Sequence, residues 1–211
     1  MKSNESKITL GVLNVIHQSP EVTQRSVAKE LGIALGLANS YLKRCIKKGL
    51  VKVRHAPTNR YAYYLTPQGF AEKTRLTAEY LSQGYHFFRI TQSQCSEIFR
   101  ICELRGWNRI ALHGLTDVAE IAVLSANQHK ILITGIVDEA TALPAYNGAP
   151  IVRKLCDLDD FDALVVSDIG NPQARYDEIR KSVPIERILV PAILGVNTNP
   201  KHVDRIYRGA Q

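Results

Sequence analysis

Residues 23–54 read TQRSVAKELGIALGLANSYLKRCIKKGLVKVR, and this stretch decides the fold of the first part of the chain. Apolar residues recur in it at helical spacing on both sides of Gly32, which predicts a short helix, a turn and a longer helix over about 35–48. Thr23 is expected to cap the short helix, with Ser26 three residues later completing the cap. Gly32 is expected to end that helix in the left-handed conformation.

The longer helix is expected to have a buried face and an exposed face. The inward residues are Ala38, Leu42 and Ile46. The outward residues are Gly36, Leu37, Asn39, Ser40, Lys43, Arg44 and Lys47. Ala34 stands where Ser or Thr would usually cap such a helix, and this costs about 1 kcal/mol of stability at the helix start.

Further elements flank these two helices. An amphipathic helix is predicted over 6–18. The alternating patterns of 50–54 and 61–66 predict a hairpin, and Thr66-Pro67 then begins another helix. The expected order is therefore helix, helix, turn, helix and a two-stranded wing.

This order and its residues resemble the winged helix-turn-helix of MarR-type regulators, in particular those associated with exopolysaccharide clusters. The stretches that carry the resemblance are residues 23–33, 41–44, 47–51 and 61–69, and the similarity covers about 8–82. It implies an α+β winged helix-turn-helix domain that binds double-stranded DNA as a homodimer.

The charge of the chain is unevenly distributed. Residues 1–85 contain 13 Lys and Arg against 5 Asp and Glu, a net charge of +8, whereas residues 86–211 contain 14 against 15, a net charge of −1. An excess of positive charge confined to one part of a chain indicates a polyanionic partner for that part. The alternative is a basic surface that only keeps the protein in solution.

The longer helix fits the major groove of DNA, where Asn39 is suited to adenine and Arg44 to guanine. Lysines hold the register through phosphates, and the wing is suited to the backbone or the minor groove. The DNA-binding candidates are Thr23, Gln24, Arg25, Gly36, Leu37, Asn39, Ser40, Lys43, Arg44, Lys47, Arg54, His55, Asn59 and Arg60. The alternative is a winged helix used for protein contacts.

Residues 84–106 form a further amphipathic stretch, and Gly84 is expected to bend or break the helix there. Its many large apolar residues favour pairing with a second copy of the chain, the alternative being a bridge within one chain. These patterns divide the chain into a winged helix-turn-helix domain at 1–83, a linking or dimerisation helix at 84–106 and an α/β domain at 107–211.

Strands and helices alternate through the last of these segments. Apolar strands are expected at 109–113, 131–137, 162–167 and 187–190, with helices after Asp117 and Asn171. Near-continuous apolar strands alternating with helices predict a parallel sheet covered on both faces, a Rossmann-like α/β domain.

The first strand and turn of this domain form an altered dinucleotide fingerprint. Gly114-Leu115-Thr116 replaces the usual glycine-rich turn, Asp117 opposes a pyrophosphate, and Asp138 falls near the distance expected for a ribose contact. The domain resembles the half-Rossmann domains of sugar acyltransferases and CoA-binding proteins, which implies a sugar nucleotide or CoA-type effector. The ligand-binding candidates are His113, Gly114, Thr116, Asp117, Val118 and Asp138. The alternative is a ligand-free dimer platform.

Other classes of protein are disfavoured by the sequence. Apolar runs are too short to cross a membrane, the four cysteines form no CxxC pair, and no metal-ligand spacing or catalytic triad is present. We therefore expect a cytoplasmic regulator that is not an enzyme and needs no cofactor to bind DNA. The alternatives are a nucleotide-sugar- or nicotinamide-dependent enzyme with an accessory winged helix, and a protein-interaction scaffold.

Overall fold

The computed structural model describes residues 2–19, 22–56 and 60–198, and the side chains of 2, 3, 55, 56 and 60 lie outside the description. The chain divides into two compact units, residues 1–85 and residues 86–211. The two units are described separately below.

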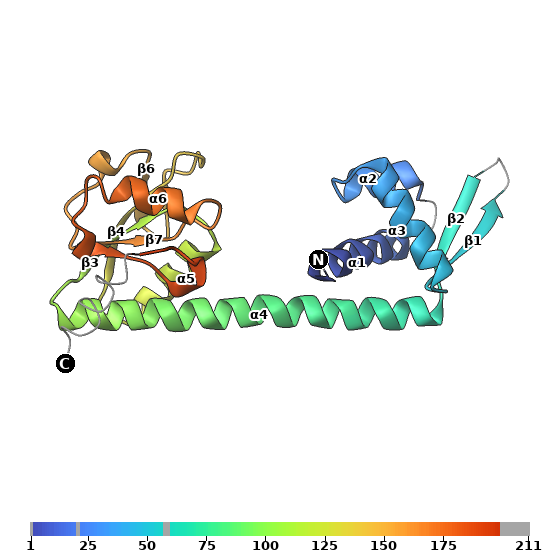
Figure 1. Ribbon diagram of the computed structural model, residues 1–211, viewed down its shortest axis with the longest axis horizontal. Helices are drawn as coiled ribbons and strands as arrows, with labels where there is room; N and C mark the ends of the chain where they lie inside the picture. Colours follow the sequence, from blue (N-terminus) through green and yellow to red (C-terminus); the bar gives the residue numbers. More distant parts are fainter. Residues whose placement is uncertain (1, 20–21, 57–59, 199–211) are drawn as a thin grey trace. The chain divides into compact units, whose positions relative to one another are not determined.

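The described part of the first unit has the predicted order of elements (Figure 1). They are α1 (Lys2–Gln18), α2 (Gln24–Glu30), α3 (Leu35–Lys47), β1 (Val51–Ala56), β2 (Arg60–Leu65) and the start of α4 (Pro67–Leu104). The two strands pair antiparallel, with Val51 opposite Leu65 and Val53 opposite Tyr63. The predicted winged helix-turn-helix architecture is confirmed.

The core of this unit lies between α1, α2, α3 and the hairpin. It contains Val12, Leu13, Ile16, Val27, Ala28, Ala38, Leu42, Cys45, Leu50, Val51, Tyr63 and Leu76. Ala38 and Leu42 face inward as predicted, but Cys45 is buried where Ile46 was expected, and Ile46 is only half-buried. The last buried position of α3 is therefore one residue earlier in the sequence than predicted, which the 3.6-residue period of the helix allows.

Thr66 fastens the end of the wing to the end of α3. Its buried Oγ1 donates to the carbonyl oxygen of Gly49 at 2.7 Å and accepts from the backbone N–H of Gly69 at 3.0 Å. Gly49 itself has a φ of +70°, a conformation that favours glycine. One hydroxyl thus joins the C-terminus of α3 to the first turn of α4.

The helix α4 continues for 38 residues through Gly84, so the expected bend or break at that residue is wrong. A helical glycine costs only about 1 kcal/mol relative to alanine. Elsewhere on α4, side-chain pairs stabilise the helix, such as Arg75 with Glu72 at 2.8 Å and with Glu79 at 3.0 Å. Within the described ranges, no helix is both long and apolar enough to cross a membrane.

The second unit is built on a six-stranded sheet. Its strands and helices are β3 (Arg109–His113), α5 (Asp117–Ala126), β4 (Leu132–Val137), β5 (Ala145–Tyr146), β6 (Ala149–Val152), β7 (Ala163–Val166), α6 (Pro172–Ile179) and β8 (Ile188–Leu189). Short 3-10 helices span Leu155–Asp157, Ile185–Arg187 and Ala192–Leu194. The strand order is β5-β6-β4-β3-β7-β8, and only the β5–β6 pair is antiparallel. The predicted parallel-sheet α/β domain is confirmed.

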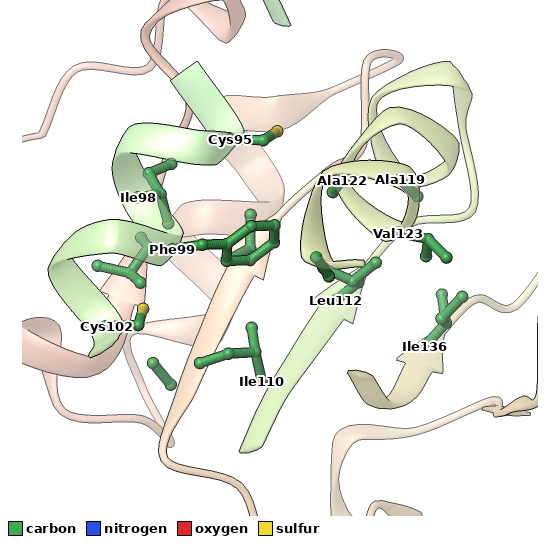
Figure 2. Close-up of a cluster of buried hydrophobic side chains, with 14 of the residues drawn as sticks. Cys95, Ile98, Phe99, Cys102, Ile110, Leu112, Ala119, Ala122, Val123 and Ile136 are labelled. Carbon is green, nitrogen blue, oxygen red and sulfur yellow. The ribbon is translucent and has the colours of Figure 1, made fainter. Parts of the chain in front are cut away.

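Helices cover both faces of this sheet. Ile110 and Leu112 of β3 pack with α5 and the C-terminal part of α4 (Figure 2). Ala111 points the opposite way and packs with Tyr176 and Ile179 of α6, since successive side chains of a strand alternate between faces.

Four apolar residues in the second half of the 84–106 stretch pack against the chain's own sheet. Cys95, Ile98, Phe99 and Cys102 are buried in the core of the second unit (Figure 2). These four residues therefore pack within one chain, whereas Phe87, Phe88 and Ile90 are only half-buried and their pairing with a second copy stays a prediction. Burial raises the pKa of the Cys95 and Cys102 thiols to about 12, which keeps them protonated.

Candidate nucleic-acid interface and ligand site

The start of α2 is fixed by the predicted capping box. The Oγ1 of Thr23 accepts from the backbone N–H of Ser26 at 3.1 Å, and the Ser26 hydroxyl accepts from the N–H of Thr23 at 2.8 Å. Gly32 adopts a φ of +62° after this helix, also as predicted. Thr23, Gln24 and Arg25 line a surface hollow of about 400 Å³ together with Val22, Leu35, Tyr61 and Tyr63.

The exposed face of α3 contains most of the residues predicted for it. Gly36, Leu37, Ser40, Lys43, Arg44 and Lys47 are exposed. Asn39 is an exception, because it is half-buried and its Oδ1 is fully buried without a hydrogen-bond partner among the described residues. Asn39 is therefore only partly exposed, and its contact with adenine stays a prediction. The start of α3 has no side-chain cap at Ala34, as predicted.

Arg44 is held by two side chains that the sequence analysis did not select. Its guanidinium forms an ion pair with the carboxylate of Glu5 in α1. It also lies 5.0 Å from the ring centroid of Tyr41, one turn earlier in α3. Both partners of the ion pair remain more than 40% exposed, with side-chain exposures of 42% and 46%. Arg44 is thus held in place yet accessible to another anion.

The wing adds cationic and aromatic side chains. Lys52 lies opposite Tyr64 across the hairpin, and the Arg54 guanidinium lies 5.7 Å from the ring centroid of Tyr64. Of the other wing candidates, Asn59 and the side chains of His55 and Arg60 lie outside the described residues. A basic, aromatic strand beside a basic helix provides sites for phosphates and for groove edges.

Residues 5–52 match a family model described as winged helix-turn-helix DNA-binding. The first unit is a DNA-binding winged helix-turn-helix domain. No curated protein sequence matches the chain.

Several solved structures are similar to part of the chain, among them the following three. The PcaV transcriptional regulator from Streptomyces coelicolor is 23% identical over 39% of this chain and 62% of its own, with a TM-score of 0.37. A MarR family transcription regulator is 22% identical over 38% and 54%, with a TM-score of 0.35. A mutant of MepR from S. aureus bound to an oligodeoxyribonucleotide is 26% identical over 40% and 62%, with a TM-score of 0.34. The chain thus covers less than two thirds of the length of each.

In the second unit, the turn from β3 to α5 is closely tied to the end of β7. Gly114 has a φ of +99°, and a Cβ on it would lie 2.8 Å from backbone atoms of Asp168. The hydroxyl of Thr116 donates to the carbonyl oxygen of Ser167 and accepts from the N–H of Val118 at 3.3 Å. The glycine therefore accommodates the chain's own backbone.

The other candidates of this turn are placed as follows. Asp138 accepts three backbone N–H groups, from Leu115 at 2.8 Å and from Ala140 and Thr141 at 2.9 Å each. Burial opposes ionisation of this carboxyl, but the three N–H groups outweigh it and hold the pKa of Asp138 below its usual value. Asp117 is exposed in the first turn of α5. The ribose contact of Asp138 stays a prediction, and the role seen here is to hold loops.

His113, at the end of β3, is buried, and its Nδ1 has no hydrogen-bond partner within the described part of the chain. Burial lowers the pKa of His113, and the charge of Arg175 lowers it further. The ring is therefore neutral at pH 7, since an unperturbed histidine titrates near pH 6.5. Among the residues that the model describes, no group of three or more His, Cys, Asp or Glu side chains is placed to hold a metal ion.

The sequence analysis missed Glu5, Tyr41, Asp168 and Arg175. The three-residue spacing of Tyr41 and Arg44 was a usable signal, because such positions are neighbours on a helix. Arg175 and Glu178 share the same spacing on α6. Glu5, by contrast, meets Arg44 through the tertiary fold across 39 positions, which no local pattern encodes.

Replacing Glu5 with Gln is expected to raise the affinity of the protein for duplex DNA about 2–5-fold. The substitution removes a negative charge from the candidate interface and frees Arg44, and exposed ion pairs of this kind are worth about 0.2–1 kcal/mol. Fluorescence anisotropy at fixed salt measures the change. In an Arg44→Ala background the same substitution is expected to have a smaller effect; an equal effect in both backgrounds would rule out action through Arg44.

Proposed function

We propose that this protein is a transcription regulator that binds a specific DNA sequence as a homodimer. In this proposal α3 enters the major groove, and the wing contacts the adjacent backbone or minor groove. The recognition helices of the two copies enter successive major grooves, about 34 Å apart. The protein binds DNA and catalyses no reaction.

The exposed cationic face of α3 carries this proposal. Lys43, Arg44 and Lys47 are exposed on the helix that follows the turn of a DNA-binding winged helix-turn-helix domain. The net charge of +8 over residues 1–85 supports the same partner. Arginine is suited to guanine, whereas lysines on such a face are suited to phosphates.

The second unit is proposed to sense a small ligand or to mediate assembly. Its five parallel strands have the spatial order third, second, first, fourth, fifth, which is typical of α/β domains that bind ligands at the carboxyl edge of the sheet. A ligand that binds with different affinity to the DNA-competent and the DNA-free protein would change DNA affinity by linkage.

Selection from a randomised duplex pool, followed by anisotropy titrations of the recovered duplex and an unrelated one, tests the proposal. We expect inverted half-sites about 10 base pairs apart and a steep fall of affinity between about 50 and 200 mM salt. Lys47→Ala is expected to weaken both duplexes alike and to reduce the salt slope by about 1. Arg44→Ala is expected to reduce the discrimination between them by about 1–3 kcal/mol.

Lys181→Ala provides the matched control, because it removes the same charge from an exposed position of the second unit. It is expected to leave DNA affinity nearly unchanged. A pool that yields no shared sequence, or a protein that binds no duplex at low salt, would reject the proposal in favour of an interaction scaffold.

A further inference from the structure

The strand order of the second unit defines one place where a ligand crevice is expected. The chain leaves β3 toward β4 and β6 on one side and reaches β7 and β8 on the other. In open α/β sheets, ligands bind outside the carboxyl ends of the strands where this order reverses. Here that point lies between the ends of β3 and β7, at His113 and Asp168.

His113 is the last residue of β3 and therefore lies at this point. It lies on the same face of β3 as Ala111, which packs with residues of α6. His113 is only 8% exposed, and its Nδ1 has no partner among the described residues. A buried polar atom without a partner is destabilising, so a ligand that supplies the missing hydrogen bond would gain binding free energy from it.

The charged groups that act on His113 are one cation, Arg175, and three carboxylates, those of Glu178, Asp168 and Glu139. Arg175 of α6 pairs with Asp168 at 3.1 Å, with Glu178 at 3.0 Å and with Glu139 at 4.0 Å. Three carboxylates therefore converge on one guanidinium, and the charge of Arg175 also acts on the carboxyl of Asp138. Two further cations, Arg153 and Lys154, follow β6, which lies beyond β4 in the sheet.

Four of the backbone donors at this edge of the sheet are already used. The N–H of Leu115 is donated to Asp138 and that of Val118 to Thr116. The N–H groups of Gly170 and Asn171 are both donated to Asp168. A phosphate or pyrophosphate would therefore meet several carboxylates, and four of the N–H groups near it would already be donated within the chain.

We propose that this edge of the sheet binds an organic cation with a guanidinium or primary ammonium group. The cationic group of the ligand takes the place of the Arg175 guanidinium between Asp168, Glu139 and Glu178. A second N–H donor of the ligand reaches Nδ1 of His113, which the Arg175 guanidinium leaves without a partner among the described residues. This ligand class replaces the sugar nucleotide or CoA-type effector expected from the sequence. Binding of the cation does not depend on the proposed function. Only the expected effect of that binding, a change in DNA affinity, rests on it.

Calorimetric titration of the full-length protein with agmatine, which carries both kinds of cation, tests the site directly. We expect binding of agmatine, with ADP-ribose and CoA as anionic probes that do not bind. Glu139→Gln is expected to weaken agmatine about 5–10-fold, since it removes one exposed carboxylate. Asp159→Asn, an exposed residue in the loop before β7, removes the same charge away from the site and is expected to have no effect.

Arg175→Met distinguishes this site from non-specific attraction to acidic surface. It vacates the position that the ligand is proposed to take, so agmatine is expected to bind about tenfold more tightly and to raise Tm more than in the unmodified protein. Weaker or unchanged binding in Arg175→Met would overturn the proposal. So would absence of agmatine binding, equal binding in Glu139→Gln and Asp159→Asn, or displacement of agmatine by ADP-ribose.

Anisotropy titrations of the duplex with and without agmatine then separate the two proposals. We expect agmatine to change DNA affinity in the unmodified protein and to have less effect in Glu139→Gln. If the protein binds agmatine at this site but binds no duplex, the DNA-binding function fails and the ligand site stands. If it binds the duplex but not agmatine, the ligand site alone fails.

Discussion

Replacing Phe99 with Ala is expected to lower the free energy of unfolding of the second unit by about 3–5 kcal/mol. The Phe99 ring is 0% exposed and fills the space between α4, α5 and β3 (Figure 2). Removing so large a buried side chain loses its transfer free energy and leaves a cavity that the neighbours fill only in part. Urea denaturation followed by circular dichroism measures the change.

Leu104→Ala, on the same helix, is the matched control for Phe99→Ala. Leu104 is 59% exposed, so its replacement is expected to change stability by no more than about 0.5 kcal/mol. The effect of Phe99→Ala is also expected to be independent of protein concentration, because its contacts lie within one chain. A loss of stability that shrinks as the protein is concentrated would place Phe99 in an interface between copies instead.

The features that sequence patterns predicted well depend on neighbouring residues. The β3 strand begins and ends at the predicted residues, Arg109 and His113, because an apolar run bounded by Asn108 and Gly114 is a local signal. The Thr23–Ser26 cap is likewise decided within four residues.

The features that sequence patterns missed depend on distant residues. The apolar face around Phe99 fits a second copy as well as it fits the chain's own sheet, and only the placement of Ile110 and Leu112 decides between them. The direction of Asn39 depends on packing around α3. Arg44 meets Glu5 across 39 positions of sequence.

The candidate ligand site shows the same division. The turn at Gly114 was found because a glycine after a strand and before a helix is a recognisable pattern. The kind of ligand that this turn would bind was not found from the sequence. The charge beside the turn is set by Asp168, which follows β7, and by Arg175 of α6. The local sequence motif therefore predicts the position of the candidate ligand site, while the tertiary fold determines the charge of the groups around it.

Gly69→Ala is the substitution expected to harm the DNA-binding unit most directly. Gly69 is buried in the first turn of α4, where a Cβ would lie 2.0 Å from the carbonyl oxygen of Leu50. That carbonyl also accepts the backbone N–H of Thr66 at 3.0 Å. Because the obstacle is backbone, the junction between α3, the wing and α4 must move. We expect a loss of about 3 kcal/mol in the free energy of unfolding of the first unit, and a parallel loss of DNA affinity.

Gly84→Ala makes the same chemical change at an exposed position of α4 where nothing lies within 4 Å of the added Cβ. It is expected to stabilise the protein by up to about 1 kcal/mol, since alanine favours the helix over glycine. Denaturant melts of both variants, with anisotropy on the selected duplex, make the comparison. Both substitutions replace a helical glycine with alanine. The difference between their effects on the free energy of unfolding therefore reports mainly the contact at Leu50. Stability and DNA affinity that are unchanged in Gly69→Ala would mean that α4 does not pack on Leu50 in solution.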